Sequence, residues 1–584
     1  MRILAVVLTF VLSLPAGAQV AGGAPAQPAA ASAVPPPPGG AAPTSAQPSP
    51  EGPVKALSDP VLTEPTAPWI GTKAYWKKNF TTPDLNVSLQ APVRLRDYVV
   101  DNKLELSLKN YLQLVLVNNT DIAIQRLNVE TPKNAIQRAF SPFDPFINSS
   151  FNTSRALTPT SNALEGASIL SNLNQPLQMR YQQTLENGTQ IISSLAWTKA
   201  STNNAFQTFN PGYSNSWAMG FSQPLLRNRG FYVNRLPIII AKSTLKSTGL
   251  RYESTLQTYM VTAENAYWDV VSAKENIKVQ EQALELSRQS LERARKEIEL
   301  GATSPLEVYQ PEQQYATAQI NLTRVQYQLL QAEDVLRRYI GADLDPEVRK
   351  LPIVLTEKVE PNLDEKPFDR EALVQQAMVL RPDLKAEKED IINADLQILS
   401  ARNTLKPLLN LTGTYTTYGR GGNQFLQGGG MIPGSPIDSW GQMFNFGYPT
   451  YAMGVTLNFP LRDHNAAANL ADTMVNKKLQ IFQQRQVEQQ IRQDVLTAIT
   501  QVESSRASVK LARIAVDYSI KRAEADQKRY DLGVITLFFL LSSQTDLTNA
   551  QSNLVSSTVQ YRRNMVNLQQ KLGTILEDKG IVVQ

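Results

Sequence analysis

Apolar residues recur at every seventh position over long stretches of this chain. One such column consists of Val270, Ile277, Leu284, Leu291 and Ile298. A second column follows Gly301 and consists of Val308, Tyr315, Leu322, Leu329 and Leu336. Because a seven-residue apolar repeat keeps one helix face against a neighbour, the pattern predicts an antiparallel coiled-coil hairpin that turns at Gly301. Its first arm, roughly 238 to 299, would be about 90 Å long at 1.5 Å per residue, which a compact globular domain does not accommodate.

The same pattern occurs twice. A shift of 232 positions places Gly301 on Gly533 and Gly341 on Gly573, and the apolar columns then coincide. Beside each apolar column runs a column of mostly small residues, which allows helices to approach closely. The simplest interpretation is a duplicated unit, whose second hairpin turns at Gly533.

Between the helical stretches the apolar period changes from seven to two. From Tyr451 to Phe459 every odd position is apolar and every even position is small or polar. Segments around Trp217 and segments after two prolines alternate in the same way. Strands of about 10 residues with this alternation are typical of a transmembrane barrel wall, although a half-buried soluble sheet alternates too. Four prolines bound these strands and are the predicted barrel-to-helix junctions: Pro145, Pro224, Pro407 and Pro460.

The N-terminus has the features of a secretory signal. Arg2 precedes an apolar run from Ile3 to Leu14, and Ala16-Gly17-Ala18 is a small-x-small cleavage site. The alternative is a membrane anchor, but the run is shorter than the roughly 20 residues that a spanning helix needs. No later stretch reaches about 18 uninterrupted apolar residues, so any membrane crossing would have to be a β-barrel. This signal and the aromatic residues near the strand ends, which include Tyr213, Trp217 and Tyr451, favour the membrane over the soluble sheet.

The composition excludes several classes of function. The chain has no Cys and one His, which excludes thiolate metal sites, disulfide scaffolds and sites that need two imidazoles. The lone His464 follows Pro460, where a solvated strand-to-helix junction is the expected role. With 57 Lys and Arg against 52 Asp and Glu, the charge does not indicate nucleic-acid binding. We therefore expect no enzyme activity, no cofactor and no metal.

The order helix, strand, strand, long helix, returning helix, repeated twice, resembles the TolC-like outer-membrane efflux proteins, or outer membrane factors. The resemblance covers about residues 104 to 576. The motifs that carry it are Asn119-Thr120-Asp121-Ile122, Arg381-Pro382-Asp383-Leu384, Phe143-Asp144-Pro145, Ser222-Gln223-Pro224-Leu225-Leu226, Leu300-Gly301 and Leu532-Gly533.

This resemblance implies a mixed α and β fold, in which an outer-membrane β-barrel continues into a long periplasmic α-helical barrel. It implies a homotrimer with four strands per chain, which gives 12 strands in all. It also implies the channel-tunnel of a tripartite efflux or type I secretion system, with a periplasmic adaptor, an inner-membrane transporter and outer-membrane lipid as partners. A competing hypothesis is a secreted trimeric coiled-coil surface protein with a structural or adhesive role, but this does not explain the strands inserted between the helices.

The sequence and the resemblance together divide the chain into seven parts. These are a signal peptide (1–18), a Pro/Ala-rich disordered linker (19–70), a periplasmic N-terminal extension (71–103), the first repeat (104–341), an equatorial linker (342–367), the second repeat (368–573) and a C-terminal tail (574–584).

The two hairpin turns are candidate docking tips, because in the family such tips meet the adaptor. The residues concerned are Leu300, Gly301, Thr303, Leu532, Gly533 and Thr536. Glycine allows close backbone approach, and Thr303, Ser304 or Thr536 is suited to capping the returning helix. Helix capping alone is the competing explanation.

The entrance is expected soon after the second turn, where many TolC-like proteins place two acidic residues. This chain has Phe539 and Ser542 at those places and Glu307 and Gln310 in the first copy, so it departs from the acidic motif. We predict that Phe539, with Phe538, forms a hydrophobic gate that closes by excluding water. The alternative is that both rings complete the core formed by Leu537, Leu540 and Leu541.

Residues 176 to 200 have no counterpart of equal length in the second repeat. Apolar residues alternate on both sides of Asn187-Gly188, a strong signal for a β-hairpin. We expect a hairpin that extends an extracellular loop. The alternative is that both strands belong to the barrel wall.

Overall fold

The computed structural model describes Lys73 and residues 95–100, 102–160, 165–301, 303–343, 346, 348–357, 367–426 and 429–581. The predicted signal peptide and the Pro/Ala-rich linker lie outside the described residues, as does most of the predicted extension 71–103.

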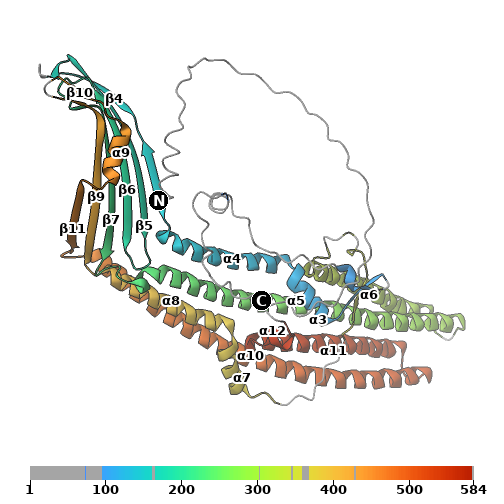
Figure 1. Ribbon diagram of the computed structural model, residues 1–584. Coiled ribbons are helices and arrows are strands. Elements are labelled where there is room, and N and C mark those ends of the chain that lie inside the picture. Colours follow the sequence, from blue (N-terminus) through green and yellow to red (C-terminus); the bar gives the residue numbers. More distant parts are fainter. Residues whose placement is uncertain are drawn as a thin grey trace, which may run out of the picture. The chain divides into compact units, whose positions relative to one another are not determined.

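The helices follow the predicted order in both halves of the chain (Figure 1). In the first half they are α3 (Leu108–Asn118), α4 (Thr120–Phe140), α5 (Phe231–Glu299), a 3-10 turn η4 (Pro305–Val308) and α6 (Tyr309–Tyr339). In the second half they are α7 (Arg370–Leu380), α8 (Pro382–Thr404), a short helix α9 (Pro436–Phe444), α10 (His464–Asp531), α11 (Leu537–Leu572) and α12 (Ile575–Asp578).

Both predicted helical hairpins are present. Helices α5 and α6 meet at Gly301, and α10 and α11 meet at Gly533. All residues of the seven-residue columns are buried or half-buried, as expected for a helix seam. Helix α5 begins at Phe231 rather than near 238, and Pro237 lies inside it. Its 69 residues therefore span about 104 Å.

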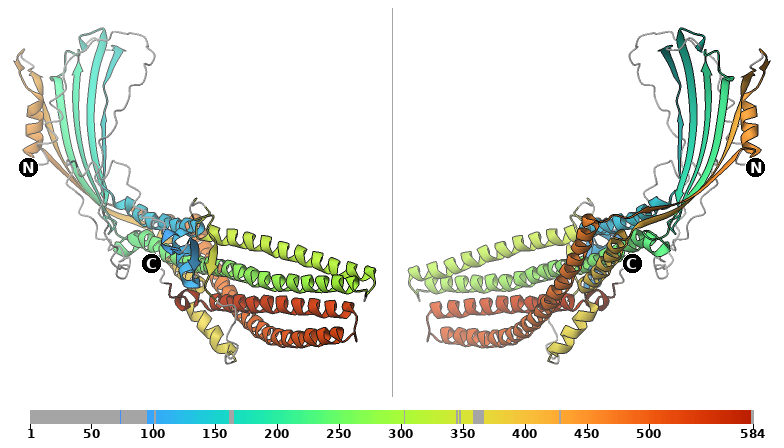
Figure 2. Two further views of the ribbon diagram at one scale, coloured as in Figure 1. Left: turned by 90° about the vertical axis from the view of Figure 1, so that its right-hand side faces the viewer. Right: turned by 90° about the vertical axis from the view of Figure 1, so that its left-hand side faces the viewer.

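The two hairpins lie side by side in one helical layer. Figure 2 shows the order α6, α5, α11, α10, so that α5 and α11 are the inner pair. Near the turns, Ala294 of α5 packs against Leu537, Leu540 and Leu541 of α11 in a small buried cluster. Ser290 donates a hydrogen bond of 3.3 Å to Gln544 across the same contact. Helices α6 and α10 thus form the two outer edges of the layer.

The large sheet consists of eight strands. They are β3 (Phe146–Phe151), β4 (Ser154–Pro159), β5 (Ile169–Thr184), β6 (Gln190–Thr202), β7 (Phe209–Pro224), β9 (Leu408–Phe425), β10 (Met431–Ile432) and β11 (Pro449–Asn458). All pairs are antiparallel. Because β3 and β4 both pair along β5, and β10 and β11 both pair along β9, the sheet is six strands wide. The expectation of four strands per chain is therefore wrong.

The two additional strands are β5 and β6, which form the hairpin detected at Asn187-Gly188. The structure shows that this hairpin is part of the sheet and does not extend an outer loop. Strand β5 pairs with β3 and β6, and β6 pairs with β5 and β7, so the backbone groups on both sides of the hairpin are hydrogen-bonded. Its turn also lies at the end of the sheet where the helices begin, since the N–H of Gly230 donates to the carbonyl of Asn187 at 3.2 Å.

A second, three-stranded sheet joins the segments before and between the two repeats. Strand β2 (Lys103–Leu106) pairs with β1 (Val99–Val100) and with β8 (Ile353–Leu355). It packs on α5, where the Tyr267 hydroxyl donates to the carbonyl of Leu106 at 3.3 Å. The main hydrophobic core lies here, between this sheet and helices α3, α5, α6 and α11.

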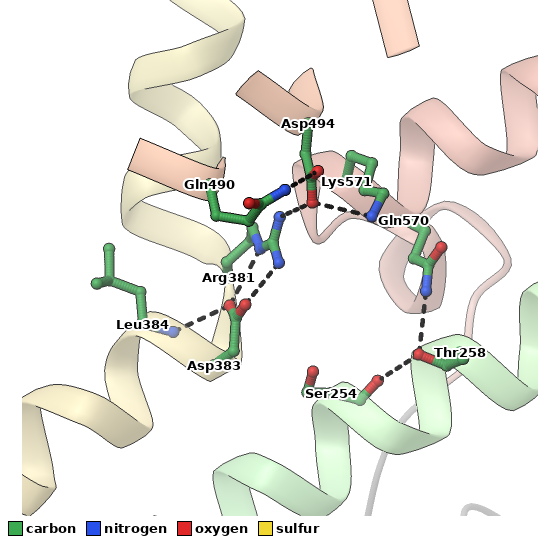
Figure 3. A network of polar contacts seen from close by, with 9 residues as sticks. All are labelled: Ser254, Thr258, Arg381, Asp383, Leu384, Gln490, Asp494, Gln570 and Lys571. Carbon is green, nitrogen blue, oxygen red and sulfur yellow. Dashed lines mark hydrogen bonds and ion pairs between the residues drawn. The ribbon is translucent and has the colours of Figure 1, made fainter. Parts of the chain in front are cut away.

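A polar network fixes the boundary between α7 and α8 against α10 and α11 (Figure 3). Arg381 forms an ion pair with Asp383 at 2.5 Å and lies 3.6 Å from Asp494 of α10. Asp494 also accepts hydrogen bonds from Lys571 at 2.9 Å and from Gln490 at 2.8 Å. The Asp494 carboxylate of α10 therefore connects the boundary between α7 and α8 to α11.

Candidate functional site at the helical tips and the sheet junction

The first tip is an exposed turn with an apolar apex. Leu300 is 83% exposed, and Gly301 has a φ of +66°, which favours glycine. Ser304 caps the following 3-10 turn, since its Oγ accepts a hydrogen bond from the N–H of Leu306 at 3.4 Å. Of the three capping candidates, Ser304 makes a side-chain cap in the first turn, whereas Thr303 is a half-buried neighbour.

The second tip has the same features. Leu532 is 79% exposed, and Gly533 has a φ of +72°. Thr536 occupies the N-cap position of α11, but its side chain makes no capping hydrogen bond. A Cβ at Gly301 or Gly533 would meet no described atom within 4 Å, so the positive φ and not a close approach within the chain explains both glycines.

The two tips are connected by contacts between α5 and the end of α10. The Arg293 guanidinium lies over the Tyr530 ring, 4.8 Å from its centroid, and pairs with Asp531 and with Glu297. The Tyr530 hydroxyl donates to Glu297 at 2.7 Å. Burial raises the pKa of Tyr530 above its ordinary value, and the hydrogen bond to Glu297 and its negative charge raise it further.

The sequence did not reveal this contact. A charged residue on a long amphipathic helix is expected to lie on the solvated face, but the structure shows that Arg293 bridges the two hairpins. The apolar columns mark the seam inside one hairpin and carry no information about the next hairpin. The spacing of four between Arg293 and Glu297, which places both on one helix face, was the available signal.

The predicted entrance residues begin α11 and η4. Leu537, Leu540 and Leu541 are buried, whereas Phe538 and Phe539 are 57% and 55% exposed, with their rings edge to face at 5.6 Å. The leucines therefore form the core of this contact, and the two rings lie outside it in this chain. Ser542 is half-buried, and Glu307 and Gln310 are exposed on the neighbouring hairpin.

The four predicted junction prolines all lie where strands meet helices. Pro145 precedes β3, and Pro407 precedes β9. Pro224 is the buried last residue of β7, and the exposed Pro460 lies between β11 and α10. The lone imidazole of His464 is exposed at the start of α10, as expected for a solvated junction.

Residues from both repeats form hydrogen bonds with each other at this junction. The backbone N–H of Asn228 donates to the Asn403 side chain at 3.1 Å, and the Asn403 amide donates back to the Asn228 side chain at 2.6 Å. The turn of the β5–β6 hairpin packs beside them, because a Cβ at Gly188 would lie 2.5 Å from the Asn228 carbonyl. The first and second halves of the chain are therefore joined where sheet and helices meet.

Comparison with known proteins assigns this architecture. The family model described as "Outer membrane efflux protein" matches residues 111–342 and 373–574. The chain belongs to the outer membrane efflux protein family. The two matched ranges correspond closely to the two predicted repeats, and the resemblance found in the sequence is confirmed. Outer membrane efflux proteins are transport channels of the outer membrane.

Curated relatives of this outer membrane efflux protein have low sequence identity to it but align over most of its length. The probable efflux pump outer membrane protein TtgC of Pseudomonas putida is 20% identical over 470 residues, which cover 80% of this chain and 83% of TtgC. The outer membrane protein TolC of Vibrio cholerae is 21% identical over 366 residues, which cover 62% of this chain and 77% of that protein.

Solved structures show the same fold. The CusC crystal structure has a TM-score of 0.58 at 15% identity and covers 83% of this chain and 95% of CusC. The outer membrane channel CmeC of Campylobacter jejuni has a TM-score of 0.57 at 16% identity and covers 83% of this chain and 88% of CmeC. Within the described ranges of this efflux protein, none of the helices combines the length and apolar character needed to cross a membrane.

Proposed function

We propose that this protein is the outer-membrane channel-tunnel of a tripartite efflux or type I secretion system. In this role a homotrimer passively exports substrates that an inner-membrane transporter and a periplasmic adaptor deliver. The observation that carries the proposal is a sheet with one apolar face, one polar face and two edges that have no partner strand among the described residues.

The two faces of the sheet differ in chemistry. On β7, Trp217, Met219 and Phe221 lie on one face, and Ala218, Gly220 and Ser222 lie on the other. The cross-strand partners continue the apolar face onto β11, where Tyr451, Met453, Val455 and Leu457 are all exposed. The apolar face suits contact with lipid, and the small and polar face suits a water-filled lumen.

The edges of the sheet need partner strands, which further copies of the chain would supply. Among the described residues, no strand pairs with the outer side of β3, β4 or β11. Unpaired backbone groups cannot remain in lipid, so other chains must complete a closed wall. Strand β3 leaves the helix junction and β11 returns to it, so β11 of one copy and β3 of the next would pair antiparallel like every other pair. Three copies, each six strands wide, would supply eighteen strands, not the twelve that the resemblance implies.

The helical layer supports the same arrangement. Its outer helices both carry exposed apolar side chains, which are Ile320, Tyr327 and Leu330 on α6 and Leu511, Ile514 and Tyr518 on α10. In a ring of copies, α6 of one chain would lie beside α10 of the next and bury both sets. This burial would extend the layer into a closed helical tunnel.

The tips and the entrance complete the proposal. The exposed apex residues Leu300 and Leu532, each followed by a glycine with open surroundings, are proposed to dock the adaptor. Phe539, together with Phe538, is proposed to form a hydrophobic gate at the entrance, since both rings lie outside the leucine core.

Purified protein in planar lipid bilayers tests the proposal. A channel gives discrete conductance steps, and its trimer in outer-membrane fractions is heat-modifiable on gels. A protein that is abundant at the cell surface but gives no conductance would support the surface-fibre hypothesis instead.

A further inference from the structure

Helix α9 is held on the sheet by two glycines of β9. A Cβ at Gly419 would lie 1.8 Å from the Ser439 carbonyl oxygen, and one at Gly421 would lie 2.7 Å from the Ser435 carbonyl oxygen. Ser439 and Met443 of α9 are fully buried against the sheet. Because glycine has no side chain, these two positions of β9 allow the backbone of α9 to pack directly on the strand.

The helix lies on the apolar face of the sheet. Thr417 of β9, which donates a 2.9 Å hydrogen bond to the Met443 carbonyl, shares its face with Gly419 and Gly421. Thr417 is also the cross-strand partner of Trp217, so all of them belong to the face that carries Trp217 and Met219. Under the proposed function this is the face that contacts lipid.

The polar groups of α9 are directed to backbone partners. The Gln442 side chain accepts a 3.1 Å hydrogen bond from the N–H of Arg420 on the free edge of β9. Asp438 accepts one of 2.6 Å from the N–H of Ser435 at the start of the helix. The Ser439 hydroxyl donates to the Pro436 carbonyl at 2.6 Å. These contacts satisfy backbone groups that lipid could not.

Apart from the buried Met443, the large apolar side chains of α9 remain partly or largely exposed. Ile437 is 76% exposed, although a helix in water normally turns such residues to the core. The Trp440 and Phe444 rings stack at 6.0 Å, and Phe444 lies 6.2 Å from Trp217. The apolar surface of the helix is therefore continuous with the apolar face of the sheet.

The helix sits at the level where this face changes from apolar to polar. Gly421 lies beside Tyr213, and the next residues along that row are Lys199 and Gln175. Aromatic rings gather just below, where Phe446 lies 6.2 Å from Trp217 and 6.3 Å from Tyr415. Aromatic girdles mark the boundary between lipid chains and water in membrane proteins.

We infer that α9 is an interfacial helix that lies in the outer membrane's lipid, with Ile437, Trp440 and Phe444 in contact with lipid near the boundary with water. The inference rests on the proposed function, because it requires the apolar face of the sheet to point outward. It assigns to the segment between β10 and β11 a role as a membrane-contacting element outside the wall of strands.

Single cysteines test this inference, because the chain has no native Cys. Ile437→Cys is labelled with an environment-sensitive fluorophore, and the protein is placed in phosphatidylcholine vesicles with or without brominated acyl chains. Two further variants calibrate the result. Met453→Cys reports the apolar face of β11, and Tyr418→Cys reports the opposite face of β9, where the side chain is 47% exposed.

We expect brominated lipid to quench the labels at 437 and 453, and iodide in the water to quench the label at 418. A label at 437 that iodide quenches, or that neither agent reaches because a second copy covers it, would overturn the inference. In both cases quenching of the 453 label by lipid would leave the proposed function intact. Loss of lipid quenching at 453 as well would contradict the proposed function itself.

Discussion

The guanidinium of Arg293 lies 4.8 Å from the ring centroid of Tyr530 and thereby joins two helical hairpins that are far apart in the sequence. The same guanidinium pairs with Glu297 on its own helix and with Asp531 on the other hairpin. Because these contacts lie next to both tips, they hold the two hairpins in one relative position where the proposed entrance lies.

Arg293→Met should loosen this contact and raise the resting conductance in planar bilayers. The variant keeps a long side chain in place of the aliphatic stem of Arg293. It removes the charge, the cation–π contact and the pairing with Asp531, which together contribute about 1–2 kcal/mol. Tyr530→Phe should have a smaller effect in the same direction, because it removes only the hydroxyl that donates to Glu297.

The matched control is Arg288→Met, on the same helix. Arg288 pairs only with Glu285 and Glu292 of its own helix among the ion pairs of the described chain. Equal conductance of the Arg288 and Arg293 variants would show that the contact between the hairpins does not restrain the tips.

Phe539→Ala should raise resting conductance and antibiotic leak with little effect on stability. The ring is 55% exposed in the chain, so its removal leaves no internal cavity. By contrast, Leu540→Ala should destabilise the protein by about 2–5 kcal/mol, because Leu540 is buried against α5. Glu307→Gln should mainly change cation selectivity. Unchanged conductance of well-formed Phe539→Ala trimers would place the gate elsewhere.

Adding side chains at the tips should abolish efflux while trimer yield stays normal. Gly301→Asn and Gly533→Asn together are suited to this test, because Asn tolerates the left-handed backbone conformation better than other residues do. The new side chains would point into open surroundings, where the adaptor is proposed to dock. Efflux is measured as drug accumulation in cells that carry the complete pump.

Gly580→Asn provides the control for backbone strain. Gly580 has a φ of +67° and equally open surroundings, but it follows α12, far along the chain from either turn. If the tip variants lose the trimer as well as efflux, the glycines serve folding and not docking.

Local periodicity explains what the sequence could predict. The seven-residue columns and the glycines at 301 and 533 fixed both hairpins, because each helix of a hairpin packs against a segment close to it in sequence. Alternation identified the strands, and Asn187-Gly188 identified a hairpin turn. These signals reside in a few consecutive residues.

Contacts between distant segments explain what the sequence could not predict. Alternation of apolar and polar residues does not indicate which strands are neighbours in a sheet. The position of β5 and β6 inside the sheet is therefore known only from the structure. Arg293 meets Asp531 across 238 residues, and no period connects them. The three-stranded sheet joins strands of two to four residues, too short for any periodicity to show.

Asp494 should make stability depend on acidic pH. Burial raises the pKa of its carboxyl, but hydrogen bonds from Lys571 and Gln490 and the charges of Lys571 and Arg381 outweigh burial and bring it below its ordinary value of 3.8. A lowered folded-state pKa means that the unfolded state binds the proton more readily. The stabilisation is therefore present above about pH 4 and is lost as the pH falls below 3.8 toward the folded-state value.

Asp494→Asn should remove this part of the pH dependence and cost about 1–2 kcal/mol at neutral pH, since it leaves Lys571 and Arg381 without their shared carboxylate. Thermal unfolding of the purified protein between pH 3 and pH 7 measures both effects, with Asp517→Asn as an exposed control that pairs with Lys521 of its own helix. Parallel stability curves for the wild type and Asp494→Asn would contradict the assignment.

Cysteine pairs should show that the β5–β6 hairpin is part of the wall in the membrane. Ser150 lies opposite Gln178, Gln178 opposite Ala196 and Ala196 opposite Ser216, so Ser150 and Ser216 are separated by two strands. Adjacent strands lie about 4.8 Å apart, which places these two residues roughly 14 Å apart. Ser150→Cys with Gln178→Cys should therefore form a disulfide on mild oxidation in outer-membrane vesicles. Ser150→Cys with Ser216→Cys should not, because the distance between these two residues is longer than a disulfide can bridge. The opposite result would mean that β3 pairs directly with β7 and that the hairpin projects from a four-stranded sheet, which would restore a twelve-stranded trimer.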